Sequence, residues 1–551
     1  MAQDGARLTR RRHDAPRERA GRWALAGLAA IPLGFLGLFF AWPVAAILGL
    51  GLRDGGRGTP VGVMLTSGET WRIVGFTLGQ AAAATVLALL AGLPVAFLLA
   101  RCALPFRNVV RVLVTVPFVL PTVVVGLAFR ALLPNSGVLA IVLANAFFNV
   151  AVVARTVGGL WAHTDRRAED AARALGASRW RAFTSVVLPA LTPAISSAAA
   201  VVFLFCATSF GVVLILGGAR YRTLETEIYL RAVNLFDLRG AAALSLLQLA
   251  AVIGALTLGA VARRRRESAL ALRGRAETAR RPQGGEWVVV TIALVVVVLL
   301  LTPIAGLVLR SLSTVDGWGI AGYQALLGVG ARDALSGVTG FAAAANSLRT
   351  AFDATLIAMT LGVLASVVLS RLPRRRPLLA GAMDTALMLP IGVSAVTLGF
   401  GYLITMDALP GDFRTSPLLV PFAQALVATP LVVRTVLPVL RAVDERLRQA
   451  AATLGASPFR VWREVDLPMA GRALLAAAGF AYVIALGEFG ATSFLVRPEA
   501  PTLPVAIARF ISRPGELNNQ MAYAACTMLM VVTVLVVLAI ERARVAEVGE
   551  F

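Results

Sequence analysis

The sequence predicts an all-α polytopic membrane protein, with about twelve transmembrane helices arranged as two parallel six-helix repeats. Three observations lead to this fold class. The 551 residues are 58% hydrophobic, whereas soluble domains average roughly 45–50%, and the mean hydropathy is +0.79. Apolar stretches long enough to cross a bilayer recur along the whole chain. The third observation is an internal repeat, which defines the architecture before any local pattern does.

The apolar stretches are predicted to be helices, because an unpaired backbone amide in hydrocarbon is costly. In the first half they lie near 23–50, 73–100, 109–133, 137–160, 188–217 and 240–262. In the second half they lie near 287–310, 346–370, 378–405, 417–440, 468–496 and 521–540. The long connections at 218–239 and 497–520 have a hydrophobic periodicity that predicts short interfacial helices facing outward.

The repeat is clearest in one polar segment. Residues 170–189 read DAARALGASRWRAFTSVVLP, and residues 449–468 read QAAATLGASPFRVWREVDLP. Gly176 aligns with Gly455 without a gap, 279 positions further on. The same offset pairs Arg155-Thr156-Val157 with Arg434-Thr435-Val436, Asp165 with Asp444, Pro189 with Pro468, Phe210-Gly211 with Phe489-Gly490, and Thr223-Leu224 with Thr502-Leu503. Six spans in each half keep both halves in one orientation, as a parallel repeat about the membrane normal.

The orientation follows from the arginines. The formal net charge is +22, and all 52 basic residues are arginine. Because they cluster between apolar spans, topology explains them better than nucleic-acid binding, and no nucleic-acid partner is predicted. The arginine-rich connections are 101–111, 166–181, 263–281, 371–376 and 441–463. The positive-inside rule therefore predicts that both termini and both repeated segments are cytoplasmic.

These spans and charges divide the chain into five predicted parts. They are a cytoplasmic Arg-rich tail (1–22), a first six-span unit (23–262) with a repeated loop at 165–189, a basic cytoplasmic linker (263–286), a second six-span unit (287–541) with its loop at 444–468, and a cytoplasmic tail (542–551). The apolar run after residue 22 lacks a clear small-residue cleavage site, so we expect an uncleaved first helix.

Each repeated loop is predicted to form two short helices joined at a glycine. Asp165 and Asp444 are placed to cap the first helix. Gly176 and Gly455 then end it, because glycine tolerates a left-handed backbone. The first helix has a small apolar face, made by Ala171, Ala172 and Leu175 in one copy and by Ala450, Ala451 and Leu454 in the other.

An aromatic turn and a proline follow the glycine in both copies. The aromatic residues are Trp180 and Phe183 in the first loop, and Phe459 and Trp462 in the second. Pro189 and Pro468 are expected to start the next membrane helix, where the missing amide of proline costs nothing.

The order acidic-Ala-Ala, then Gly, then Leu-Pro resembles the EAA loop of bacterial ABC importer permeases of the binding-protein-dependent type. The likeness covers nearly the whole chain as two fused permease units. In that family the loop forms a coupling helix that sits in a groove of a cytoplasmic ATPase. The resemblance implies this role for Asp170, Ala171, Ala172 and Gly176, and for Gln449, Ala450, Ala451 and Gly455. Asp170 and Gln449 stand where the family has Glu, so the second contact is expected to be weaker electrostatically.

The missing lysine indicates where ATP is handled. A phosphate-binding loop needs the pattern GxxxxGK[ST], and this chain has no lysine. The chain is therefore predicted to have no catalytic residue and no cofactor, with ATP and Mg used by two copies of a separate cytoplasmic ABC ATPase. The resemblance also implies an extracytoplasmic solute-binding protein and a place in the bacterial plasma membrane. Two histidines and three widely spaced cysteines give no metal-ligand spacing.

Polar residues inside predicted spans are candidates for the translocation pathway, because lipid makes them costly. Glu488 lies in the eleventh span and aligns with Ser209 in the fifth. Its carboxylate either attracts a cationic solute or is hydrogen-bonded between helices near the outer helix end. Asn145, Asn149 and Gln424 are further candidates, and hydrogen bonds between helices explain them equally well.

An ATP-driven importer is the favoured function. An ion-gradient-driven secondary transporter is the alternative, but it would not need paired polar loops, and a polytopic membrane enzyme would need a catalytic cluster that the sequence lacks. Residues 205–229, FCATSFGVVLILGGARYRTLETEIY, resemble thiamine permeases more closely than iron(III) permeases. The fixed positive charge of thiamine fits Glu488, as ferric ion also would. Thiamine is therefore the predicted solute and iron(III) the alternative.

Overall fold

The computed structural model describes residues 25–52, 58–134, 137–218, 220–264, 280–314, 317–328, 337–372, 377–408 and 416–545. The predicted tail 1–22, most of the linker 263–286 and most of the tail 542–551 lie outside these ranges.

The described chain is almost entirely helical. In the first half the elements are α2 (Trp42–Leu52), α3 (Val61–Thr66), α4 (Gly68–Arg101), α5 (Arg107–Val119), α6 (Thr122–Leu132), α7 (Val138–His163), α8 (Arg167–Ala174), α9 (Arg179–Ala182), α10 (Leu188–Ala207), α11 (Gly211–Leu216), α12 (Leu224–Tyr229) and α13 (Leu238–Arg264). In the second half they are α14 (Glu286–Ser311), β1 (Ser313–Thr314), β2 (Gly317–Trp318), α15 (Ala321–Leu326), α16 (Gly340–Arg371), α17 (Pro377–Gly392), α18 (Ala395–Thr405), α19 (Leu419–Ala442), α20 (Glu445–Thr453), α21 (Pro458–Val461), α22 (Leu467–Gly487), α23 (Thr492–Leu495), α24 (Leu503–Ser512) and α25 (Glu516–Val545). The antiparallel pair β1–β2 is the one sheet within the described ranges.

Ten helices of the described chain are long and apolar enough to cross a membrane, and two bent helix pairs bring the number to twelve. The predicted all-α polytopic fold is confirmed. The prediction of continuous helices at 109–133 and 378–405 is wrong, because α5 meets α6 at 102° and α17 meets α18 at 96°. Pro121 holds the preceding Leu120 in an extended conformation. Ser394 is extended as well, and its hydroxyl accepts hydrogen bonds from the Val396 and Thr397 amides to start α18.

Two other predicted spans are shorter than expected. The fifth ends at Ala207 and the eleventh at Gly487, where residues 188–217 and 468–496 were expected to be continuous. In both halves a short non-helical stretch follows, and a short helix, α11 or α23, then resumes. Because both halves have this interruption at the same position, it is a feature of the repeated unit.

The two halves repeat the same helix packing. α4 packs against α7 in the first half, as α16 packs against α19 in the second. A Cβ built on Gly92 would lie 2.6 Å from Val153, and one on Gly362 would lie 2.5 Å from Val432. Glycine at both positions lets the backbones approach closely, as small residues do in membrane helix packing.

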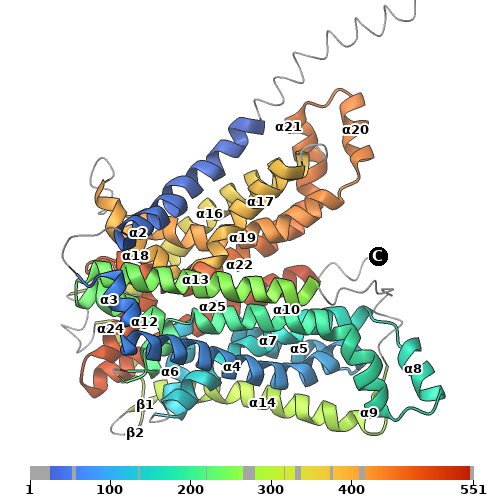
Figure 1. The fold of residues 1–551 in the computed structure, drawn as a ribbon, viewed down its shortest axis with the longest axis horizontal. Coiled ribbons are helices and arrows are strands. Elements are labelled where there is room, and N and C mark those ends of the chain that lie inside the picture. The colour runs from blue at the N-terminus through green and yellow to red at the C-terminus, as the bar shows by residue number, and fades with distance from the viewer. Residues whose placement is uncertain are drawn as a thin grey trace, which may run out of the picture.

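The first helix of each half packs against the other half. Figure 1 shows the blue α2 beside the orange helices of the second half, and the Phe39 ring lies 4.8 Å from Phe422 and 6.3 Å from Tyr402. α14, the first helix of the second half, packs against α4 and α6. The two sequence repeats therefore interlock in space.

The outer connections do form helices, α12 and α24, but these are buried. The prediction of interfacial helices is wrong in this respect, because the side chains from Leu224 to Ile228 and from Leu503 to Ile507 are all buried. The Leu224 amide donates a hydrogen bond to Thr77 Oγ1 (3.0 Å), and the Leu503 amide donates to Ser347 Oγ (2.6 Å). These bonds tie each short helix to the long membrane helix of its own half.

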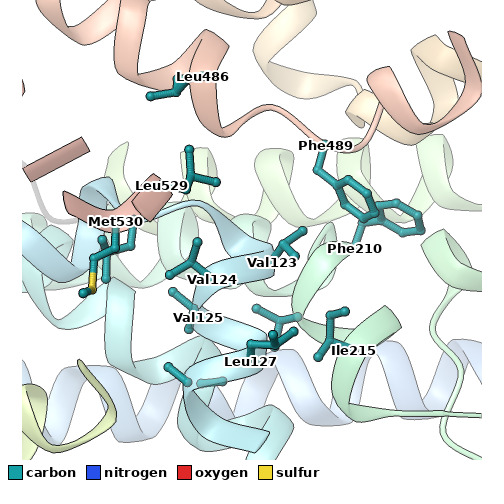
Figure 2. Close-up of a cluster of buried hydrophobic side chains, with 14 of the residues drawn as sticks. Val123, Val124, Val125, Leu127, Phe210, Ile215, Leu486, Phe489, Leu529 and Met530 are labelled. Carbon is teal, nitrogen blue, oxygen red and sulfur yellow. The ribbon is translucent and has the colours of Figure 1, made fainter. Parts of the chain in front are cut away.

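The halves meet through an apolar cluster. Figure 2 shows the rings of Phe210 and Phe489 stacked on one another, with Val123 from an adjoining helix beside them. The two ring centroids lie 5.2 Å apart with the planes 19° from parallel. Because the two phenylalanines are equivalent residues of the repeat, their contact marks where the two halves approach each other on the axis that relates them.

Candidate coupling loops and translocation pathway

The two repeated loops lie at the same end of the molecule. Figure 1 shows α8 with α9, and α20 with α21, on the right, while α12 and α24 lie at the opposite end. Asp444 caps the first helix of its loop, as predicted, while Asp165 lies one residue before Arg166, the N-cap of α8, and makes the equivalent hydrogen bond. Asp165 Oδ1 accepts a hydrogen bond from the Arg167 amide (3.0 Å), and Asp444 Oδ1 accepts one from the Arg446 amide (2.9 Å).

The predicted glycine ends are confirmed as well. Gly176 has φ +89° and Gly455 has φ +83°, which only glycine adopts without strain. The Ala177 amide donates to the Ala172 carbonyl and the Ala456 amide to the Ala451 carbonyl, both at 3.1 Å. This bond across the glycine is the Schellman arrangement, which satisfies the last carbonyls of a helix.

Each loop exposes large apolar side chains to solvent. Leu175 is 90% exposed and Trp180 73%, while Leu454 is 89% exposed and Phe459 72%. Neither α8 nor α20 buries a side chain. Asp170, Ala171, Gln449 and Ala450 are exposed, and Ala172 and Ala451 are half-buried. Such matched apolar surfaces are typical of protein–protein contact sites.

Pro189 and Pro468 lie in the first turn of α10 and α22, as predicted. These helices nevertheless continue the second helix of each loop, because the spans run without interruption from Arg179 to Ala207 and from Pro458 to Gly487. A π-helical turn precedes each proline, at Phe183–Val187 and Trp462–Asp466. The wider turn accommodates a residue without an amide inside a continuous helix. Each loop is thereby rigidly joined to the span that follows it.

The loops differ in how they are attached to the membrane helices. Asp466, which is 1% exposed, accepts hydrogen bonds from Arg371 (3.1 Å) and from Arg448 of α20 (2.8 Å). Burial by itself would lower the pKa of Arg448, but Asp466 and Glu445 raise it, so this arginine stays charged. The equivalent of Asp466 in the first loop is Val187.

The first loop is attached through a backbone carbonyl. Arg166 Nη2 donates to the Arg101 carbonyl at 3.4 Å. Arg101 is 2% exposed, and within the described chain its Nη1 has no hydrogen-bond partner. Because the first loop has Val187 at the position of Asp466, it lacks the carboxylate that pairs with two arginines in the second loop.

Glu488 lies in the interruption after α22, where it is 7% exposed. Its Oε1 accepts a hydrogen bond from the Ala491 amide (2.8 Å), and its Oε2 accepts from the Thr492 amide (3.0 Å) and the Thr492 hydroxyl. The carboxylate is therefore hydrogen-bonded, as one of the two predicted alternatives has it. However, its partners come from its own loop rather than from a neighbouring helix.

Three candidate pathway residues come together in the first half. Ser209 Oγ donates to Asn145 Oδ1 and Asn145 Nδ2 donates to Gln80 Oε1, both at 2.8 Å. Gln80 Nε2 donates to the Cys206 carbonyl at 2.7 Å, and Asn149 Nδ2 donates to the Asn145 carbonyl at 2.8 Å. The network secures the interruption after α10 to α4 and α7. Gln80 escaped the sequence analysis because it lies within an otherwise apolar run.

Gln424 lies apart from this network, in the second half. It is the residue equivalent to Asn145 by the offset of 279. It is 2% exposed, and its Oε1 accepts no hydrogen bond from any described residue.

A second buried carboxylate was missed by the sequence analysis. Glu225 of α12 is 0% exposed; it accepts a hydrogen bond from Ser394 Oγ (2.6 Å) and a short one from Gln248 Nε2. Ser394 belongs to the other half of the protein. The sequence shows Glu225 in a stretch interpreted as an outer connection, where a carboxylate is unremarkable.

In the described ranges, no group of three or more His, Cys, Asp or Glu side chains is placed to hold a metal ion.

The chain matches one protein family twice. The family description, "Binding-protein-dependent transport system inner membrane component", fits residues 92–314 and 358–545. Each match contains one of the two repeated loops, so the repeat seen in the sequence corresponds to two copies of the family unit.

Individual relatives extend over most of the chain. The chain is 27% identical over 550 residues to the thiamine transport system permease protein ThiP of Brucella abortus (strain 2308), which covers 95% of this chain and 97% of that protein. It is 25% identical over 494 residues to ThiP of Escherichia coli (strain K12), covering 84% and 88%. The sulfate transport system permease protein CysT of Escherichia coli is 34% identical over 179 residues, covering 29% of this chain and 64% of that protein.

Proposed function

Because this chain belongs to the family of binding-protein-dependent transport system inner membrane components, and is thus the transmembrane permease of an ABC importer, we propose that its solute is thiamine. The likeness to thiamine permeases along almost the whole chain is the observation that carries this proposal. Two buried carboxylates, Glu225 and Glu488, agree with a solute of fixed positive charge. Family membership decides against the ion-gradient-driven alternative.

The two repeated loops are the proposed docking points for two copies of a cytoplasmic ABC ATPase. The residues assigned to this contact are Asp170, Ala171, Ala172 and Gly176 in the first loop, and Gln449, Ala450, Ala451 and Gly455 in the second. Leu175, Trp180, Leu454 and Phe459 add exposed apolar surface beside them. The loops and both termini are then cytoplasmic, and ATP hydrolysis takes place in the partner, since this chain has no phosphate-binding loop.

Movement of the docked loops would reach the centre of the protein through two rigid helices. Each loop continues into a helix of 29 or 30 residues, about 45 Å long, that ends just before Phe210 or Phe489. In Figure 1 the two groups of helices diverge toward the end that carries the loops. Phe210 and Phe489 meanwhile remain stacked, as expected for a pathway closed on the outer side.

When ATP draws the two ATPase subunits together, the loops approach each other. The two rigid helices that continue from the loops then separate the stacked rings of Phe210 and Phe489, which opens the pathway outward. Hydrolysis reverses the movement. Ser209 and Glu488 immediately precede the two phenylalanines, so they are placed to position the stacked rings that close the pathway. Asn145 and Asn149 position Ser209 through the hydrogen-bond network, and Gln424 is the equivalent candidate in the other half.

Reconstitution tests the proposal directly. The permease, its ATPase and its binding protein are placed in proteoliposomes, and uptake of labelled thiamine is measured with and without ATP. We expect ATP-dependent uptake that is not reduced by an excess of iron(III). Uptake of iron(III) in place of thiamine would establish the alternative solute.

A further inference from the structure

Glu225 is a buried carboxylate with neutral hydrogen-bond partners. Its two oxygens accept from the Ser394 hydroxyl and the Gln248 amide. Glu227, two residues further along the same helix, is instead paired with Arg222 (3.2 Å) and Arg231 (2.9 Å). Burying a charge without a counter-charge is costly, and burial accordingly raises the pKa of Glu225 to about 8. The contrast within one short helix indicates that the position of Glu225 has a use besides stability.

The contact of Glu225 with Ser394 joins the two halves of the protein on one side only. Ser394 immediately precedes α18, as Pro121 immediately precedes the equivalent α6. The residue equivalent to Glu225 in the second half, 279 positions on, is Pro504. A pair of prolines thus replaces the carboxylate and the hydroxyl on the other side of the axis. Packing of the two halves alone does not require a polar group on one side only, whereas such a group can bind one end of an asymmetric solute.

The ring of Tyr229 lies on the same face of α12 as Glu225 and contacts aromatic rings of other elements. Tyr229 follows Glu225 by four residues, which places both side chains on one face of the helix. The ring centroid of Tyr229 lies 5.3 Å from that of Phe210 and 5.3 Å from that of Phe494 in the other half. Figure 2 shows Phe210 in turn stacked on Phe489. One carboxylate and several rings therefore meet where the two halves must separate during transport.

We propose that Glu225, Tyr229, Phe210 and Phe494 form a subsite for an organic cation, which this conformation holds closed. A carboxylate together with aromatic faces is the chemistry that recognises quaternary nitrogen. In this conformation the Ser394 hydroxyl donates a hydrogen bond to the Glu225 carboxylate, at the position where the cation would bind. When the halves separate, Ser394 leaves with the second half, and the solute cation takes its place. The inference rests on the proposed function, since it assigns residues to a cationic solute such as thiamine.

The variant Glu225→Gln tests the negative charge of this side chain separately from its hydrogen bonds. Gln248 Oε1 is buried and accepts no hydrogen bond from any described residue. Once the Gln248 amide turns over, a glutamine at position 225 can donate to this oxygen in place of the bond that Glu225 accepts from Gln248 Nε2, and it can still accept the bond from Ser394. The variant is therefore expected to keep two hydrogen bonds and lose only the ability to carry a negative charge. Glu227→Gln is the matched control, because it removes a carboxylate from the same helix outside the proposed subsite.

The test measures thiamine uptake and ATP hydrolysis by the reconstituted complex, together with the melting temperature of the permease. For Glu225→Gln we expect uptake to fall about tenfold or more, while ATP hydrolysis stimulated by the loaded binding protein persists. Tyr229→Leu should reduce uptake similarly, and Tyr229→Phe, which keeps the ring, should not. Glu227→Gln should affect the melting temperature more than uptake.

Each remaining outcome decides against the subsite. Wild-type uptake by Glu225→Gln, or equal uptake by the two Tyr229 variants, would overturn it. If a stable Glu225→Gln variant lost both uptake and ATP hydrolysis, Glu225 would be a structural contact between the two halves instead of a cation site. If the wild-type complex carries no thiamine at all, the proposed function fails first, and the subsite fails with it.

Discussion

In the second repeated loop, Asp466 joins Arg448 of α20 to Arg371 at the end of α16, whereas the first loop has Val187 at that position and a buried Arg101. The backbones of the two loops nevertheless agree, with an equivalent aspartate hydrogen bond and the same left-handed glycine. The repeat thus preserves the shape presented to a partner, while the attachment of each loop to the membrane helices has diverged.

The same division recurs between the halves. Phe210 and Phe489 are equivalent and stack on each other, yet Ser209 precedes one ring and Glu488 the other. At this contact the apolar packing is repeated, while the polar residue beside each ring differs.

The largest expected effect is on the feature that the loops share. Gly176→Val and Gly455→Val each place a β-branched residue at a φ near +85°, at a cost of about 1–3 kcal/mol, and so change the direction of the docking surface. We expect each variant to lose co-purification with the ATPase while still inserting in the membrane. Gly471→Val is the control, because nothing lies within 4 Å of a Cβ built there and its φ is ordinary. Normal assembly of either loop variant would show that the two loops are not equivalent docking points.

The next effect tests the difference between the loops. Asp466→Asn removes a 1% exposed carboxylate from two arginines. Breaking such a pair costs about 3–5 kcal/mol when fully buried, and we expect about 2–3 kcal/mol here because Arg371 is partly exposed. Thermal unfolding of the purified permease measures the loss.

Val187→Asp is the reciprocal variant. If Val187 is the structural equivalent of Asp466, a carboxylate there meets Arg101 and Arg166, and the melting temperature should fall by only a few degrees. Aggregation or severe destabilisation, as expected for an unpaired buried charge, would disprove the equivalence.

A smaller effect is expected at the interruption after α22. Glu488→Gln leaves one oxygen to accept from the amides of residues 491 and 492, so at least one of three hydrogen bonds is lost. We expect a stability loss of about 1–2 kcal/mol and uptake reduced a few-fold, with ATPase binding unchanged. Ser209→Ala is the comparison in the other half. Unchanged uptake by Glu488→Gln would make this residue a cap and nothing more.

The smallest perturbation tests which side of the membrane the loops occupy. Ser178 and Ser457 are exposed residues that cap α9 and α21. Ser178→Cys and Ser457→Cys should leave uptake nearly intact, and an impermeant thiol reagent should label both only from the inner side. The native cysteines Cys102, Cys206 and Cys526 are buried and give little background. Labelling from outside would overturn the proposed orientation.

Much of the fold was predictable because its signals are local in the chain. Apolar runs of sufficient length specify spanning helices wherever they occur. The hydrogen bonds of Asp165 and Asp444 and the turns at Gly176 and Gly455 involve residues only a few positions apart. The offset of 279 identified the two units without any knowledge of their contacts.

The interruptions in the spans were hidden for the opposite reason. Pro121 and Ser394 lie within long apolar stretches, and hydropathy averaged over such a stretch does not reveal a bend of 102° or 96°. Thr208 and Glu488, where α10 and α22 end, are likewise surrounded by apolar residues.

The sequence by itself determined where the apolar membrane segments lie, the two repeats, and the caps and glycine turns of the loops, because each depends on neighbouring residues. Tertiary structure alone decided that the first helix of each half packs on the other half, and that the short outer helices are buried. It also brought Glu225 to Ser394, 169 positions away. Such contacts depend on how finished helices pack together, and no local pattern in the chain encodes which distant side chains then meet.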